Sequence, residues 1–223
     1  MDAMTHLALA ALAFMVTHFV TSTPLRGVLA GKLGEGRYLG LYSLVAVLAL
    51  VWMVIAYGKA PLEPLWGATR WLPIVTMPFA LVLLATGYFR NPAAVMQGGL
   101  LKNPDPARGI IRVTRHPVMW AIMLWSGAHL LARGDVKSVL FFGSFFVIAG
   151  AGTILQDLRK ARTLGEDWAR FSAVSSNVPF LAILQGRNTL RAGEIGWAKP
   201  LAGIALYAIL LYAHEWLFGA RPY

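Results

Sequence analysis

The sequence predicts an all-α polytopic membrane protein with six transmembrane helices and both termini outside. Apolar residues make up 57% of its 223 residues, and charged residues only 13%. A soluble domain of this length cannot bury so much apolar surface, whereas a helix that crosses the hydrocarbon needs about 20 apolar residues. Six runs lack Lys, Arg, Asp and Glu altogether: residues 3–25, 38–57, 71–89, 117–132, 138–156 and 200–214.

Each run is interpreted as one span. The first run is expected to be a retained span rather than a cleaved signal peptide, because residues 1–6 lack the basic residues that begin one. The fourth run has only 16 residues; its span can tilt, begin within Arg115–His116, or thin the bilayer locally. The last run extends to residue 220 if Glu215 lies at the far interface. Residues 178–184 are apolar but too few to cross.

The distribution of basic residues predicts the orientation. Of the 20 Lys and Arg residues, 15 fall in the segments after the first, third and fifth runs. Because cytoplasmic loops are enriched in Lys and Arg, these segments are predicted to be cytoplasmic. The net charge of +10 is therefore explained by topology, and the predicted partner is the lipid bilayer rather than nucleic acid.

The whole chain, residues 1–223, is predicted to be a single membrane domain with a cytoplasmic amphipathic segment at about 157–199. Residues 157–171 are expected to continue the fifth span as a helix. Their apolar residues fall near helical spacing, so this helix is able to lie on the membrane surface. Those apolar residues are Leu158, Leu164, Trp168 and Phe171.

The absence of cysteine excludes several kinds of site. Without thiols there are no disulfides, iron–sulfur clusters, thiolate zinc sites or covalent c-type haem. The six runs contain no carboxylates, which argues against a di-iron carboxylate site or a proton pump. Histidine remains as the ionisable residue of the predicted spans.

Three histidines, His18, His129 and His214, lie within predicted spans. An intramembrane ionisable residue is a candidate functional residue, and two neutral imidazoles from facing helices suit the iron of a b-type haem. At 1.5 Å per residue they lie about 10, 18 and 21 Å from the cytoplasmic ends of their spans. These depths favour a pair of His129 with His214. A pair of His18 with His129 stays open because helices tilt.

The sequence Arg115-His116-Pro117 marks the beginning of the fourth span, because proline suits the first turn of a helix. Its arginine and histidine are expected at the cytoplasmic mouth, where they are able to hold an anion such as a haem propionate or a phosphate. Arg26, at the cytoplasmic end of the first span, is a second candidate for a propionate. The alternative is that these residues only set the topology.

Several segments resemble the NnrU family of bacterial inner-membrane proteins, which gene context links to nitrogen-oxide metabolism. They are THFVTSTPLRGVLAGKLGEGRYLGLYSL (17–44), RNPAAVMQGG (90–99), GIIRVTRHPVMWAIMLWSGAHLLARGD (109–135) and PFLAILQGR (179–187).

The resemblance implies a function and a pair of ligands for a haem iron. The family includes plant-type 15-cis-zeta-carotene isomerases that carry a b-type haem. The resemblance implies haem iron bound by His18 and His129. The depths estimated above keep His214 as the substitute ligand for His18. The implied role is denitrification, with a small gas as ligand, or redox-dependent isomerisation of a lipid-soluble substrate such as zeta-carotene.

Two other interpretations are open. Arg-His-Pro followed by DLRKARTLGEDWARF (157–171) also resembles isoprenylcysteine carboxyl methyltransferases and membrane sterol reductases. That similarity implies S-adenosylmethionine or NADPH bound near Arg115, His116 and Asp157. The other interpretation is a non-catalytic scaffold or conduit, which predicts that replacing the three intramembrane histidines changes only stability. The visible spectrum of the purified protein distinguishes the haem interpretation from these two interpretations.

Overall fold

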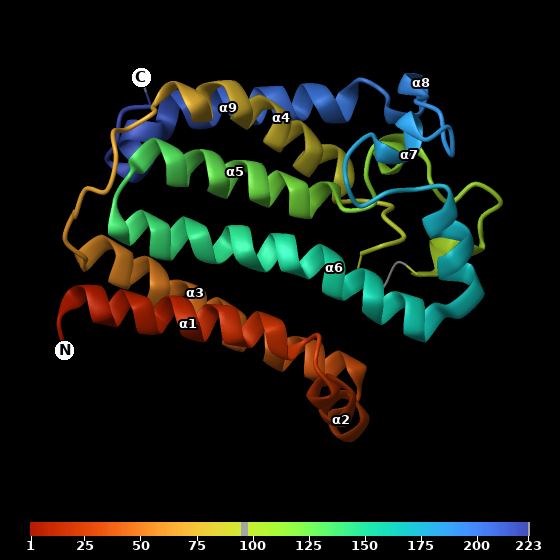
Figure 1. Cartoon of the computed structure of the whole chain (residues 1–223), viewed down its shortest axis with the longest axis horizontal. Helices are drawn as coiled ribbons and strands as arrows, with labels where there is room; N and C mark the ends of the chain where they lie inside the picture. Colours follow the sequence, from red (N-terminus) through yellow and green to blue (C-terminus); the bar gives the residue numbers. More distant parts are fainter. Residues whose placement is uncertain (95–97, 223) are drawn as a thin grey trace. The chain divides into compact units, whose positions relative to one another are not determined.

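A computed structural model describes residues 1–94 and 98–222, and the chain is all-α over those residues (Figure 1). The only β pairing described is an isolated bridge between Pro64 and Asp135. The elements are α1 (Ala3–Val20), α2 (Pro24–Leu33), α3 (Glu35–Lys59), α4 (Trp71–Gly87), the 3-10 helices η1 (Gly98–Lys102) and η2 (Gly109–Arg112), α5 (Pro117–Arg133), α6 (Val136–Ala173), α7 (Leu181–Leu184), α8 (Ala192–Ile195) and α9 (Ala198–Phe218).

Every charge-free run forms a helix. Helices α1, α3, α6 and α9 are long and apolar enough to cross a membrane. Helices α4 and α5 have 17 residues each, at the lower limit for a span. The chain therefore has the helices of a multi-pass membrane protein, while the count of six spans and the outward termini stay predictions.

The helix of the first span ends shortly before the first charge-free run does. Helix α1 ends at Val20, and α2 begins at Pro24. The hydroxyls of Thr21 and Thr23 donate to the carbonyls of His18 and Val20 at 2.7 and 2.8 Å. These bonds compete with the helical ladder, and Pro24 has no N–H with which to continue it. A new helix therefore begins at the proline.

The chain divides into two compact units, and the first comprises Met1–Thr69 and Ser126–Ile148. Here α1 packs along α3, and Leu7 and Met53 are completely buried. The Asp135 carboxylate caps α6 by accepting the Ser138 N–H at 2.9 Å. Gly134 adopts a φ of 64°, and its carbonyl accepts two N–H groups of the loop before α4.

The second unit comprises Arg70–Trp125 and Ala149–Tyr223, and α4 packs along α9 within it. Gly203 allows this approach, because a Cβ there would lie 2.8 Å from the Leu81 carbonyl oxygen. The Tyr207 hydroxyl donates to the Ile74 carbonyl at 3.0 Å. A separate apolar cluster joins the loop before α5 to the end of α6: Ala93, Leu101, Ala107, Ile111, Trp168 and Phe171.

Helix α6 confirms the prediction that the fifth run continues into a charged helix. It extends to Ala173 and is interrupted at Gly165, which has φ 50° and ψ −123°. Phe171 is completely buried and Trp168 is 3% exposed. This part of the apolar face therefore packs against protein, while Leu158 stays half-exposed. Membrane-surface binding by this segment stays a prediction.

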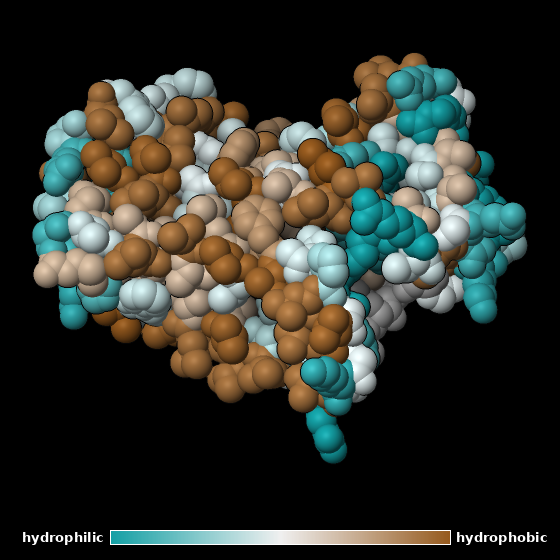
Figure 2. All heavy atoms as spheres, turned by 60° about the horizontal axis from the view of Figure 1, so that its bottom comes forward, coloured by the Kyte–Doolittle hydropathy of each residue, from teal (hydrophilic) through white to brown (hydrophobic). Residues whose placement is uncertain are grey.

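Helices α3 and α9 bury few of their hydrophobic side chains. Only 17% of the residues in the most apolar stretch of α3 are buried, and only 6% of those in α9. Figure 2 shows hydrophobic residues spread over the helical part of the surface, and hydrophilic residues at the end where the loops between α6 and α9 lie. Such exposure suits contact with lipid rather than with water.

Replacing Gly203 with alanine is expected to lower the free energy of unfolding by about 1–3 kcal/mol, because the added methyl group meets the α4 backbone. Chemical unfolding in detergent measures this loss. Gly40→Ala on α3 is the matched control, because a Cβ there meets no atom within 4 Å, and it should be neutral or slightly stabilising. Equal losses in both variants would contradict the packing of α4 on α9.

Candidate functional site

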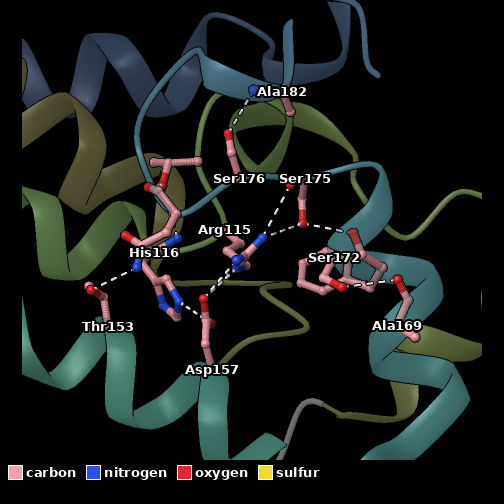
Figure 3. Close-up of polar contacts among 12 residues, drawn as sticks. Arg115, His116, Thr153, Asp157, Ala169, Ser172, Ser175, Ser176 and Ala182 are labelled. Atoms are coloured by element: carbon pink, nitrogen blue, oxygen red, sulfur yellow. Dashed lines mark hydrogen bonds and ion pairs between the residues drawn. The ribbon is translucent and has the colours of Figure 1, made fainter. Parts of the chain in front are cut away.

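The segment Thr114–Pro117 is fixed to the chain that follows α6. The Thr114 hydroxyl donates to the Asn177 carbonyl at 2.5 Å and accepts the His116 N–H at 3.2 Å. The Arg115 N–H donates to the Ser176 carbonyl at 2.9 Å. Helix α5 begins at Pro117, as the sequence predicted. These bonds point the side chains before the proline toward α6 (Figure 3).

Asp157 on α6 binds both side chains of the Arg-His-Pro sequence. Arg115 donates through Nε and Nη2 to Oδ2 of Asp157 at 2.9 and 2.7 Å. Nε2 of His116 lies 2.6 Å from the other carboxylate oxygen, Oδ1. Figure 3 shows the two side chains converging on this one carboxylate. We call Arg115, His116 and Asp157 the carboxylate cluster.

The cluster is largely enclosed. The His116 side chain is 2% exposed, while those of Arg115 and Asp157 are 14% and 18% exposed. Asp157 lies one residue past the charge-free run 138–156, so it is outside the predicted span. Burial raises the pKa of Asp157, but hydrogen bonds from His116 and Arg115 and their charge outweigh it. The pKa of Asp157 therefore lies below its usual range, and the carboxylate stays ionised.

This geometry limits the chemistry of the carboxylate cluster. In the neutral ring, Nε2–H donates to Asp157, and Nδ1 then carries the lone pair, as in histidines oriented by a carboxylate. Arg115 also donates through Nη1 to the Ser175 carbonyl at 3.2 Å. Its guanidinium is thus engaged by protein groups on two sides. The cluster therefore links the start of α5 to α6, and its guanidinium is already paired with protein groups.

A buried lysine lies one turn further along α6. Nζ of Lys160 donates to the carbonyls of Pro92 and Ala94, both at 3.0 Å. Burial lowers the pKa of Lys160 to about 8, and the charge of Arg159 adds to this effect. Nζ also lies 5.7 Å from the ring centroid of Trp168. In the sequence alone, Lys160 counts only as a topology signal.

A second ionic network surrounds Arg112. Its Nε and Nη2 donate to the two carboxylate oxygens of Glu194 at 2.7 and 2.9 Å. Nη2 also donates to Asp105 at 2.5 Å, and Nη1 donates to Asn188 at 2.7 Å. Hydrogen bonds from Arg112 lower the pKa of Glu194 to about 2 against an ordinary 4.5. The same partners raise the pKa of Arg112. No motif in the sequence predicted this network.

The histidine of α1 makes a defined hydrogen bond. Nδ1 of His18 lies 2.8 Å from the Phe14 carbonyl oxygen. Because a carbonyl only accepts, Nδ1 carries the proton, and Nε2 of the neutral ring carries the lone pair. The His18 ring lies 4.4 Å from the Phe14 ring and 6.1 Å from the Tyr42 ring.

His129 on α5 stacks on Phe142 of α6, with ring centroids 5.3 Å apart. Phe141 contacts both Phe142 and Phe145, and Phe145 contacts Phe14 beside His18. His18 and His129 therefore border the same run of aromatic rings in the first unit.

The other two predicted site residues lie near helix ends. Nδ1 of His214 donates to the Ala220 carbonyl at 2.7 Å in the second unit, so the proton is again on Nδ1. Arg26 forms an ion pair with Glu35 and lies over the Tyr38 ring at 5.5 Å from its centroid. Of the described residues, no group of three or more His, Cys, Asp or Glu is placed to hold a metal ion. A bis-histidine haem needs only two.

A family model described as NnrU protein matches residues 6–222. The chain belongs to the NnrU family. Its sequence is also similar to 15-cis-zeta-carotene isomerase, chloroplastic, of Arabidopsis thaliana. The two are 33% identical over 117 residues, which cover 50% of this chain and 31% of that protein. No solved structure matches the chain.

The structure brings together some of the residues that the sequence singled out in this NnrU-family chain. Arg115, His116 and Asp157 form one cluster. His18 and His129 lie at the two ends of a succession of four phenylalanine rings rather than in mutual contact. Within the segment 90–99, residues 95–97 lie outside the described residues. The roles of His18, His129, His214, Arg26, Arg115 and His116 in haem binding stay predictions.

Replacing Asp157 with asparagine is expected to lower the free energy of unfolding by about 3 kcal/mol, because Arg115 loses its counter-charge in a largely buried site. Asp167→Asn on the same helix is the control. Its ion pair with Arg170 is about half-exposed, so the change should be below about 0.5 kcal/mol. Denaturant unfolding measures both. A loss no larger at Asp157 than at Asp167 would refute the structural role of the cluster.

The Glu194 network predicts loss of stability in acid. A carboxyl with a lowered pKa stabilises the fold above its unfolded pKa, and this contribution disappears as pH falls through the folded pKa. For Glu194 the window is from pH 4.5 to about 2. Thermal unfolding across this window should depend less steeply on pH in Glu194→Gln than in the unmodified protein. Parallel pH profiles would argue against the lowered pKa.

Proposed function

We propose that this protein binds a b-type haem in its first unit and supports redox-dependent isomerisation of a lipid-soluble polyene such as a carotene. The observation that carries the proposal is the 33% identity over 117 residues to a 15-cis-zeta-carotene isomerase. That region covers 31% of the isomerase, so activity and substrate are transferred as a proposal. Helices with exposed apolar faces suit a substrate that reaches the protein through lipid.

His18 and His129 would hold the iron. An iron ligand must be a neutral imidazole that offers a lone pair, and its other nitrogen usually donates to a carbonyl or carboxylate. His18 fits this requirement, because its Nδ1–H is held by the Phe14 carbonyl. The aromatic rings beside both histidines suit the apolar macrocycle.

When bound, the haem supplies an iron centre that exchanges one electron. The residues of the chain orient the ring nitrogens and keep water away from the iron. Phe14 performs both tasks for His18: its carbonyl fixes the tautomer and its 4%-exposed side chain covers the ring. Arg26 and Arg115 are the proposed partners of the propionates, which would then compete with Glu35 and Asp157.

The bacterial inner membrane and a role in nitrogen-oxide metabolism remain the alternative setting for the same haem. A low-spin iron with two histidines suits electron transfer, whereas a site with one open position binds carbon monoxide or nitric oxide. The enclosed carboxylate cluster lends no specific support to S-adenosylmethionine or NADPH binding, because its charges are paired with one another.

Histidine variants test the ligands. His129→Ala should abolish haem retention under either pairing, because His129 is shared by both. His18→Ala should do so only if His18 is the partner, and His214→Ala only if His214 is. Haem per protein chain, measured on purified protein expressed with added haem, reports each result.

His6→Ala is the matched control. His6 also lies on α1, but its Nε2 accepts the Trp52 indole N–H at 2.7 Å, so it has no lone pair left for iron and its loss should leave haem content unchanged. A His129 variant with full haem and an unaltered spectrum would show that the ligand assignment is wrong. An unmodified protein without haem would remove the cofactor proposal entirely.

A further inference from the structure

A cavity of about 520 Å³ lies within the second unit, whereas His18 and His129 belong to the first. Three basic residues line it: Arg90, Arg108 and Lys199. None of the three makes a hydrogen bond or ion pair with any side chain in residues 1–94 and 98–222. Among the described residues they have no bonded counter-ion, and the charge of Arg108 contributes to the lowered pKa of Glu194.

Two carboxylates also line the cavity, but both are engaged. Asp105 and Glu194 accept hydrogen bonds from Arg112, which is 4% exposed behind them. Together, the two carboxylates and Arg112 carry a net charge of −1. The three basic residues of the lining carry a charge of +3. The cavity therefore keeps an excess of about two positive charges, which attracts an anion.

The cavity lies at the ends of apolar helices. Arg90 follows α4 closely, and Lys199 is in the first turn of α9. Both residues line the same cavity, so the end of α4 and the start of α9 lie near each other. Apolar side chains of Phe89, Leu100 and Ile195 form other parts of the lining. A charged group beside apolar surface at a helix end is the setting of a lipid headgroup.

We propose that this cavity binds a phosphate group through Arg90, Arg108 and Lys199. Arginine pairs with phosphate oxygens through parallel N–H bonds, and lysine adds a point charge. The phosphate would come from an anionic lipid headgroup or from a free phosphate, and the chemistry of recognition is the same for both.

The backbone at Arg90 gives independent support. Its φ of 57° is in the left-handed region, and Phe180 is the only other non-glycine residue with positive φ among those described. An L-residue with a long side chain costs free energy there, whereas glycine does not. A strained non-glycine residue that lines a cavity is typical of a binding site.

Native mass spectrometry of the full-length protein in detergent tests the proposal, with phosphatidylglycerol and inorganic phosphate as separate probes. Whichever of the two probes the unmodified protein binds more tightly, the double variant Arg90→Gln/Arg108→Gln should bind it at least about tenfold more weakly. Lys102→Gln is the matched control: Lys102 is an exposed cation in the same loop region but does not line the cavity. It should keep affinity within about twofold.

Arg90→Gly guards against misfolding of the double variant. Glycine accepts the positive φ, so this variant should melt no lower than the unmodified protein and still lose binding.

The two probes distinguish the sources of phosphate. Retention of phosphatidylglycerol that inorganic phosphate does not displace indicates a lipid headgroup site. Displacement by inorganic phosphate, with the same dependence on Arg90 and Arg108, indicates a site for free phosphate. The proposal is overturned if neither probe binds, if the arginine variants bind as well as the unmodified protein, or if Lys102→Gln weakens binding equally. Haem content is unaffected in every case, so this test is independent of the proposed function.

Discussion

Hydrocarbon offers no hydrogen-bond partners, and this constraint accounts for most polar contacts along the apolar helices. Side chains there bond to carbonyls of their own helix. The Thr86 hydroxyl donates to Val82, the Ser144 hydroxyl to Leu140, and Nδ1 of His18 to Phe14. The same bond that satisfies His18 places its proton on Nδ1. The bond that satisfies His18 inside an apolar helix thereby leaves the lone pair on its Nε2.

Charged residues gather where this constraint ends. Asp157 is the first charged residue after the fifth apolar run, and it binds Arg115 and His116 just before α5 begins. It thereby ties the start of one apolar helix to the end of another. Arg112 and Glu194 make a comparable tie between the loop before α5 and α8. Glu194 also lines the cavity that contains Arg90, Arg108 and Lys199, so the Arg112–Glu194 ion pair lies at its edge.

The helices were predictable because burial in lipid leaves long charge-free runs in the sequence. The break between α1 and α2 was less so, since Thr21–Thr23 and Pro24 also suit the end of one span. Arg115, His116 and Asp157 were singled out from their local motifs, and they do meet. Lys160 and the Arg112–Glu194 pair were missed because their partners lie 68 and 82 residues away. A count of basic residues predicts the topology but does not reveal such distant partners.

The proposed haem joins membership of the NnrU family to the histidines of the first unit. Its presence is decided most directly by the reduced-minus-oxidised visible spectrum of the purified, unmodified protein. Two imidazoles from His18 and His129 predict sharp low-spin bands on reduction, which carbon monoxide leaves unchanged because no position on the iron is open. A protein that shows no haem absorbance in either state would contradict the account.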